Sequence, residues 1–123
     1  MEKHNIGKHF ILDINNVWFN KFYKFDEKYI EDFIVELISK NWLNVLSSNF
    51  HFFWNIKSFT WVVLLSESHF SIHTWPEFSY VSMDLFSCNL SKDLSTNIEI
   101  ILKELLSEFF DGDILVDKKI INR

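Results

Sequence analysis

Hydrophobic residues recur at helical spacing in two segments of the chain. In residues 27–40 they form one stripe, and Asp26 can cap the first turn. A second stripe runs through residues 91–110, where Ser91 can cap the start and Gly112 can end the helix. The two stripes consist of Tyr29, Ile30, Phe33, Ile34, Leu37 and Ile38, and of Leu94, Ile98, Ile101, Leu102, Leu105 and Phe109. We therefore predict two amphipathic helices.

Most other segments are rich in β-branched and aromatic residues, which favour strands. We predict strands over residues 7–14, 43–54, 59–66, 69–75, 79–88 and 113–121. The segment 79–88 alternates strictly, which is typical of a strand with one buried face. Its two faces carry Val81, Met83 and Leu85 on one side and Tyr80, Ser82, Asp84, Phe86 and Cys88 on the other. We expect the first set to lie beneath the helices.

This succession predicts an α+β fold, a two-layer sandwich of a mainly antiparallel sheet with both helices on one face. The 123 residues fit a single domain, residues 1–123. Two helices can cover only one face of such a sheet, so the face that carries Cys88 must meet solvent or a partner. The 14 phenylalanines and 5 tryptophans of this small chain favour a partner.

Charge and cysteine content narrow the class of protein. The net charge of −5 disfavours a nucleic-acid partner, because binding a phosphate backbone requires a basic face. Cys88 is the only cysteine and cannot form a disulfide within the chain. The N-terminus lacks a signal-peptide pattern, and apolar runs such as residues 61–65 are too short to cross a bilayer. We expect a soluble cytoplasmic protein that binds neither membranes nor nucleic acids.

Hydroxyls, imidazoles and a carboxylate are concentrated in residues 66–77, and the thiol of Cys88 follows. His69 and His73 are four apart, like a helical zinc pair, but their segment is predicted to be extended, so we predict no metal. A hydrolase site usually needs a glycine-built oxyanion hole, and no glycine is near Ser68 or Cys88. Taken one at a time, these residues are also compatible with ordinary strand and turn positions.

Taken together, these residues match a longer pattern. Residues 67–77 (ESHFSIHTWPE), 84–88 (DLFSC) and 7–13 (GKHFILD) resemble the prokaryotic S-adenosylmethionine decarboxylase proenzymes, over most of residues 7–110. The resemblance implies self-cleavage between Glu67 and Ser68, which would give a β chain of residues 1–67 and an α chain of residues 68–123. Ser68 would become a covalent pyruvoyl cofactor that forms a Schiff base with the substrate amine and acts as an electron sink.

The same resemblance assigns roles to other residues. His73 matches the base that completes processing, and Cys88 matches the acid that returns a proton to the substrate carbon. Thr60 stands where the family usually has a serine whose hydroxyl supports cleavage. Thr60 and Ser68 could share a face of a regular strand. His73 has the opposite parity, so we expect a turn or bulge between Ser68 and His73.

Three further residues match substrate-binding positions. Glu77 corresponds to a carboxylate that contacts the ribose across a dimer, and Trp75 belongs to the same retained motif. Trp54 corresponds to an aromatic near the adenine, although plain core packing accounts for it equally well. The resemblance implies a homodimer in which the uncovered sheet faces pack together into a four-layer αββα sandwich.

The substrate stays open at this point, although S-adenosylmethionine leads because Trp75 and Glu77 are retained. The expected enzyme is a carboxy-lyase that supplies spermidine and polyamine biosynthesis. Residues 56–60 read IKSFT where the family has PQGVS, so a glycine is lost and a lysine gained near the substrate pocket. A pyruvoyl-dependent L-ornithine or L-arginine decarboxylase is therefore an alternative. The replacement at Thr60 leaves a third possibility, a non-cleaving relative that serves as a partner subunit.

Overall fold

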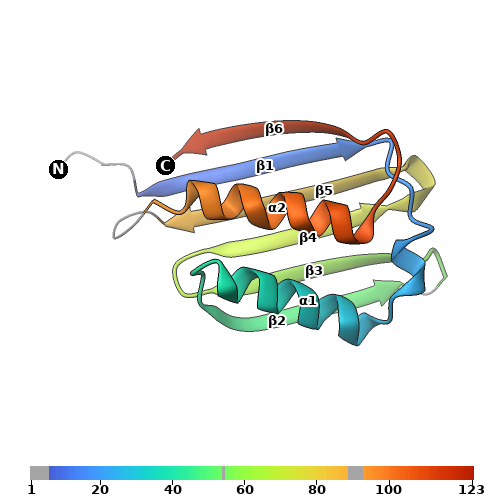
Figure 1. Ribbon diagram of the computed structural model, residues 1–123, viewed down its shortest axis with the longest axis horizontal. Coiled ribbons are helices and arrows are strands. Elements are labelled where there is room, and N and C mark those ends of the chain that lie inside the picture. Colours follow the sequence, from blue (N-terminus) through green and yellow to red (C-terminus); the bar gives the residue numbers. More distant parts are fainter. Residues whose placement is uncertain (1–5, 54, 89–92) are drawn as a thin grey trace.

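The computed structural model describes residues 6–53, 55–88 and 93–123. Within them lies an antiparallel six-stranded sheet of strand order β2-β3-β4-β5-β1-β6, with α1 and α2 side by side on one face (Figure 1). The predicted two-layer α+β fold is therefore confirmed. The elements are β1 (Gly7–Asn15), η1 (Phe22–Lys24), α1 (Glu27–Lys40), β2 (Val45–Phe53), β3 (Ser58–Leu65), β4 (His69–Trp75), η2 (Pro76–Phe78), β5 (Tyr80–Cys88), α2 (Ser95–Phe109) and β6 (Leu115–Asn122).

The observed start of α1 agrees with the start predicted from the sequence, whereas that of α2 differs. Asp26 caps α1 as predicted, because its carboxylate accepts a hydrogen bond from the amide of Tyr29 at 2.7 Å. Helix α2 begins at Ser95 rather than at residue 91, and the proposed cap Ser91 lies outside the described residues. The carboxylate of Asp93 accepts from both the amide and the hydroxyl of Ser95, and this local turn precedes the helix. No helix in the described ranges is long and apolar enough to span a membrane.

The core lies between the helices and the sheet and contains many of the aromatic residues. Val81, Met83 and Leu85 are buried there, as the alternation of β5 predicted. Phe22 stacks on Phe59 with ring centroids 4.8 Å apart. The other large aromatics of the core are Phe10, Phe19, Trp61, Phe70, Phe109 and Phe110. Much of the aromatic excess is therefore explained by the core of a single chain.

The opposite face of the sheet is uncovered by helices and carries a mixture of polar and apolar side chains. On β3 the exposed apolar residues are Val62 and Leu64, which are 41% and 49% accessible. Ser82, Asp84 and Cys88 of β5 share this face, because each alternates with a buried neighbour. We call this surface the open face.

Gly7 sets the close spacing of β1 and β5 beside Cys88. A Cβ at position 7 would lie 2.2 Å from the carbonyl oxygen of Ser87, so the Gly7→Ala substitution must push the end of β5 away. We expect a loss of about 1–3 kcal/mol in the free energy of unfolding, measured by urea denaturation. Asn15→Ala, at the exposed far end of β1, is the control and should be near neutral. Unchanged stability of Gly7→Ala would contradict this packing.

Candidate active site

The turn between β3 and β4 carries the Glu67–Ser68 bond and is fastened from two sides. The amide of Leu65 donates to the carbonyl of Ser68 at 3.0 Å, which closes the turn. The loop after α1 holds its other side. The amide of Ser66 donates to the carbonyl of Asn44 at 3.1 Å, and the Asn44 side chain donates to the Ser66 hydroxyl at 2.6 Å. The predicted cleavage bond is thus presented on a short turn whose ends are anchored to regular structure.

Ser68 and Cys88 lie next to each other at the end of the sheet. The backbone amide of Cys88, the last residue of β5, donates to the Ser68 Oγ at 3.1 Å. Both residues line a hollow of about 230 Å³. The other residues of its wall are Trp42, Leu43, Asn44, Leu65, Ser66, Glu67 and Leu94. The half-buried Cys88 is a free thiol, so a hydroxyl and a thiol border one small space.

Thr60 and His73 form a second pair on the open face. They are cross-strand partners in β3 and β4, with the Thr60 Oγ1 3.0 Å from the His73 Nδ1. Strand β4 pairs with both neighbours without a register shift from His69 to His73. The expected bulge is therefore absent from β4, and the change of direction occurs in the turn at residues 66–68. Since β3 ends at Leu65, Ser68 belongs to this turn and does not share a strand face with Thr60.

The two pairs are separated along the sheet. His69 directly follows Ser68, and from His69 to His73 the strand advances about 13 Å at about 3.3 Å per residue. Trp75, the last residue of β4, and Glu77, in η2, lie still further from Ser68, and both are exposed. Trp54 lies outside the described residues. Within one chain, Ser68 and Cys88 are thus at one end of β4, whereas Thr60, His73, Trp75 and Glu77 are towards the other.

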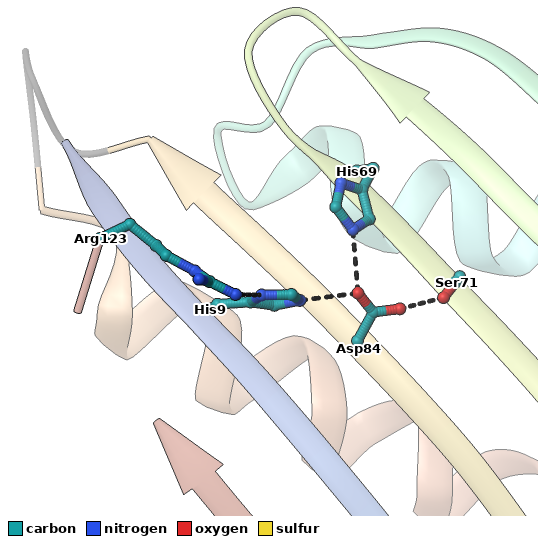
Figure 2. Close-up of polar contacts among 5 residues, drawn as sticks. All are labelled: His9, His69, Ser71, Asp84 and Arg123. Atoms are coloured by element: carbon teal, nitrogen blue, oxygen red, sulfur yellow. Dashed lines mark hydrogen bonds and ion pairs between the residues drawn. The ribbon is translucent and has the colours of Figure 1, made fainter. Parts of the chain in front are cut away.

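Between these two regions lies a polar network centred on Asp84 (Figure 2). The Asp84 Oδ2 is 2.7 Å from the Nε2 of His9 and 2.9 Å from the Nε2 of His69, while the hydroxyl of Ser71 donates to Oδ1. A guanidinium nitrogen of Arg123 lies 3.0 Å from the Nδ1 of His9. Since arginine only donates, Nδ1 must accept, and His9 carries its proton on Nε2 and donates it to Asp84. The network joins β1, β4, β5 and the C-terminal residue.

His9, His69 and Asp84 are also of the right type for a metal site, with ligand atoms within 4.8 Å of one another. In the observed arrangement the His9 Nε2 carries a proton, so a metal ion would require Arg123 to leave and the imidazole to change tautomer. The residues therefore fit a hydrogen-bond network better than a metal centre. Sequence reasoning missed this cluster, because nothing in the local pattern indicates that β1 pairs with β5.

The network controls the ionisation of Asp84. Partial burial alone would raise the pKa of Asp84, but hydrogen bonds from Ser71, His9 and His69 outweigh it and hold the pKa below its usual value. A carboxyl group whose pKa is lowered by folding stabilises the folded state at pH values above its ordinary pKa of about 3.9. This stabilisation disappears as the pH falls through the pKa of the folded state. The ionised carboxylate is therefore part of the folded structure at neutral pH.

We expect Asp84→Asn to lower stability at pH 7 and to flatten the loss of stability between pH 5 and pH 2, because the variant has no carboxylate to protonate. Urea denaturation midpoints across this range measure the effect. Asp113→Asn, which changes an exposed carboxylate outside the network, should keep the wild-type pH profile. An Asp84→Asn profile parallel to that of the wild type would contradict the role of the network.

The chain is similar to known proteins over nearly its whole length. The profile of the S-adenosylmethionine decarboxylase family matches residues 8–112. S-adenosylmethionine decarboxylase proenzymes from Persephonella marina and Sulfurihydrogenibium sp. are each 35% identical to it, over 90% and 93% of this chain and 80% and 83% of theirs. The proenzyme from Archaeoglobus fulgidus is 30% identical over 85% of this chain and 91% of its own.

A solved structure supports the fold. The crystal structure of the adenosylmethionine decarboxylase from Aquifex aeolicus superposes with a TM-score of 0.76, covering 98% of this chain and 92% of the other at 23% identity. At this sequence identity the structural similarity establishes a shared fold. The assignment to a family rests on the sequence matches. The profile match and the relatives together show that this chain belongs to the S-adenosylmethionine decarboxylase family.

Proposed function

We propose that this chain is the proenzyme of a pyruvoyl-dependent S-adenosylmethionine decarboxylase. It cleaves itself between Glu67 and Ser68 and then converts S-adenosylmethionine into its decarboxylated form and CO₂, for spermidine synthesis in the cytoplasm. The observation that carries this proposal is the pairing of Ser68 and Cys88 on one hollow, with the Ser68 Oγ held by the Cys88 amide. The proenzyme names of the relatives support it.

The cleavage uses atoms of the turn itself. The Ser68 Oγ adds to the carbonyl carbon of Glu67, and the C–N bond breaks, so an ester replaces the amide and Ser68 gains a free amine. Removal of the Ser68 α-proton expels the Glu67 carboxylate and leaves a dehydroalanine. Addition of water with loss of ammonia then gives a ketone at the new N-terminus. The hydrogen bond from the Cys88 amide holds the Ser68 hydroxyl within the turn before this sequence starts.

The base for α-proton removal must come from another copy of the chain. His73 is about 13 Å along the strand from His69, the neighbour of Ser68, so it cannot reach the Ser68 α-carbon within its own chain. A twofold axis between two packed open faces, crossing the strands midway, brings the Thr60–His73 pair of each chain opposite the Ser68–Cys88 pair of the other. The site is then complete only in the dimer.

The surface between the two pairs suits such a contact. Val62 and Leu64 are exposed on β3, and the half-buried Ile11 and Phe86 lie on the same face of β1 and β5. An exposed apolar sheet face beside the site is typical of a surface that becomes buried. The same axis brings the partner subunit's Trp75 and Glu77 towards the hollow, which gives these distant residues a route to the substrate.

The chain also supplies a proton donor for the decarboxylation. When formed, the pyruvoyl group provides a carbonyl that condenses with the substrate amine and accepts the electrons left by CO₂. Cys88 lines the same hollow, so its thiol can return a proton to the substrate α-carbon. This position at the end of β5 supports the proposal that Cys88 is the proton donor.

Two departures from the family pattern are compatible with this function. Thr60 keeps its hydroxyl within 3.0 Å of the His73 Nδ1, so the replacement of serine preserves the contact. Lys57, in the altered loop, lies with its ammonium 5.7 Å from the ring centroid of Tyr23 and accepts a hydrogen bond from the Tyr23 hydroxyl through its carbonyl. Its ammonium is therefore held by Tyr23 rather than by the hollow at Ser68.

The purified protein should resolve into fragments of residues 1–67 and 68–123 under denaturing mass spectrometry and should release CO₂ from S-adenosylmethionine. Ser68→Ala should persist as one intact species without activity, because it lacks the attacking oxygen. Ser71→Ala, a nearby hydroxyl on the open face, is the control for cleavage. Cleavage of Ser68→Ala would refute the proposal. Release of CO₂ only from ornithine or arginine would assign the chain to the alternative substrates, and a stable intact wild type would favour a non-cleaving subunit.

His73→Ala should accumulate the ester, which hydroxylamine breaks. Co-expression with Ser68→Ala should restore cleavage of the His73→Ala chain, since the Ser68→Ala partner supplies an intact His73. The control partner is the double variant Ser68→Ala/His73→Ala, which offers no imidazole at this position and should restore nothing. Mass spectrometry distinguishes the chains. If the wild type cleaves itself but the His73→Ala chain stays uncleaved in the mixture, the base acts within its own chain.

A further inference from the structure

Cleavage would turn residue 68 into a chain end and remove two of its attachments. Before cleavage this residue is held by the peptide bond to Glu67 and by the hydrogen bond from the Cys88 amide to its Oγ. In the proposed sequence of steps, the bond between Oγ and Cβ breaks when the Glu67 carboxylate is expelled, so the Oγ leaves with Glu67. Both attachments are therefore lost as the reactive carbonyl is formed.

The carbonyl oxygen of residue 68 keeps its hydrogen bond from the Leu65 amide, at 3.0 Å. Leu65 is the last residue of β3 and lies two residues before the cut, so it belongs to the other fragment and is itself close to a new chain end. Chain ends are poorly ordered unless they are tied down. Since β4 begins to pair with its neighbours at His69, an attachment at His69 decides how firmly residue 68 is held.

The side chain of His69 supplies such an attachment. Its Nε2 lies 2.9 Å from the Oδ2 of Asp84 (Figure 2), and its ring stacks on that of Phe86 with centroids 6.2 Å apart. Because the ionised carboxylate only accepts, His69 donates from Nε2. All three residues belong to the C-terminal fragment, and cleavage changes none of their atoms, so these contacts survive the cut.

The carboxylate that holds His69 is itself fixed in place. The hydroxyl of Ser71 donates to its Oδ1, and the Nε2 of His9 donates to its Oδ2 at 2.7 Å. The side chains of His9 and Asp84 are only 17% and 26% accessible, so water competes weakly for these bonds. Hydrogen bonds to an ionised group are stronger than those between neutral groups. Asp84 is therefore a fixed point to which the start of β4 is attached.

We propose that His69 and Asp84 are positioning residues, which hold the pyruvoyl group at residue 68 in place once the chain is cut. The inference rests on the proposed decarboxylase function. A reacting atom that is displaced by about 1 Å can react on the order of 10²-fold more slowly. Before the cut the turn is fastened independently, through the hydrogen bonds between Ser66 and Asn44, so the His69 contact matters mainly after cleavage.

The first test compares cleavage with decarboxylation in variants of His69. His69→Ala should cleave as completely as the wild type, but its kcat for S-adenosylmethionine should fall about tenfold or more. His69→Gln should restore most of kcat, because its amide nitrogen is the same number of bonds from Cα as the imidazole Nε2 and can donate to Asp84. His69→Phe keeps a ring against Phe86 but has no donor, and it should not restore kcat.

A double variant tests whether His69 acts through Asp84. Asp84→Asn should also lower kcat without preventing cleavage. If the two residues act as one unit, His69→Ala/Asp84→Asn should be no more than about twofold slower than His69→Ala. Asp113→Asn, which changes an exposed carboxylate outside the network, is the control and should keep the wild-type kcat. Fully multiplicative losses in the double variant would contradict the proposed coupling.

Hydrogen exchange measures the position of the chain end without using activity. In the cleaved protein, His69→Ala should speed amide exchange in residues 69–75 roughly tenfold, because the start of β4 frays. In the uncleaved Ser68→Ala background, the same substitution should change exchange little. A residue that only stabilised the fold would speed exchange in both forms. Sedimentation of His69→Ala should match the wild type, and a smaller species would instead assign the effect to assembly and contradict the inference.

Equal kcat values for the wild type and a fully cleaved His69→Ala would overturn the inference while leaving the decarboxylase function intact. Parallel losses of cleavage and of kcat would also overturn it, because His69 would then support the turn before the cut. The same holds if His69→Gln is as slow as His69→Phe. A wild type that neither cleaves nor releases CO₂ would refute the proposed function itself, and this inference with it.

Discussion

The antiparallel pairing of β5 with β4 on one side and β1 on the other fixes the positions of the Ser68–Cys88 pair and of the carboxylate at the centre of the polar network. This pairing brings the last residue of β5, Cys88, level with the turn that carries Ser68, so an amide hydrogen bond can hold the hydroxyl. Four residues before Cys88, it places Asp84 between His9 and His69. A shift of one residue would turn each of these side chains to the opposite face.

Because the helices cover only one face of the sheet, the two faces carry different kinds of side chain. The helix-covered face is a continuous aromatic core, while the open face carries the Thr60–His73 pair and the polar network. Because β4 runs straight between the two ends, no local rearrangement of one chain can join His73 to Ser68. Under the proposed function a second copy would supply what the first cannot reach, so assembly would be part of the chemistry rather than an addition to it.

The sequence predicted the helices and strands well, but it did not predict which strands pair with one another. Periodicity identified both helices, the six strands, the Asp26 cap and the inward face of β5, because these depend on residues close together in the chain. Strand order depends on distant contacts, so the Asp84 network was missed. The start of α2 was misplaced, since the apolar stripe gives no sign of the Asp93 turn.

The strand order has a consequence for a chain severed at Glu67–Ser68. The N-terminal piece would retain β1, α1, β2 and β3, and the C-terminal piece β4, β5, α2 and β6. Since β1 lies between β5 and β6, the first piece has a strand inserted into the sheet of the second (Figure 1). Three interstrand seams, β3–β4, β5–β1 and β1–β6, would hold the pieces together. The severed protein would thus stay a single interlocked body, and the cut would free only the new chain ends at the hollow.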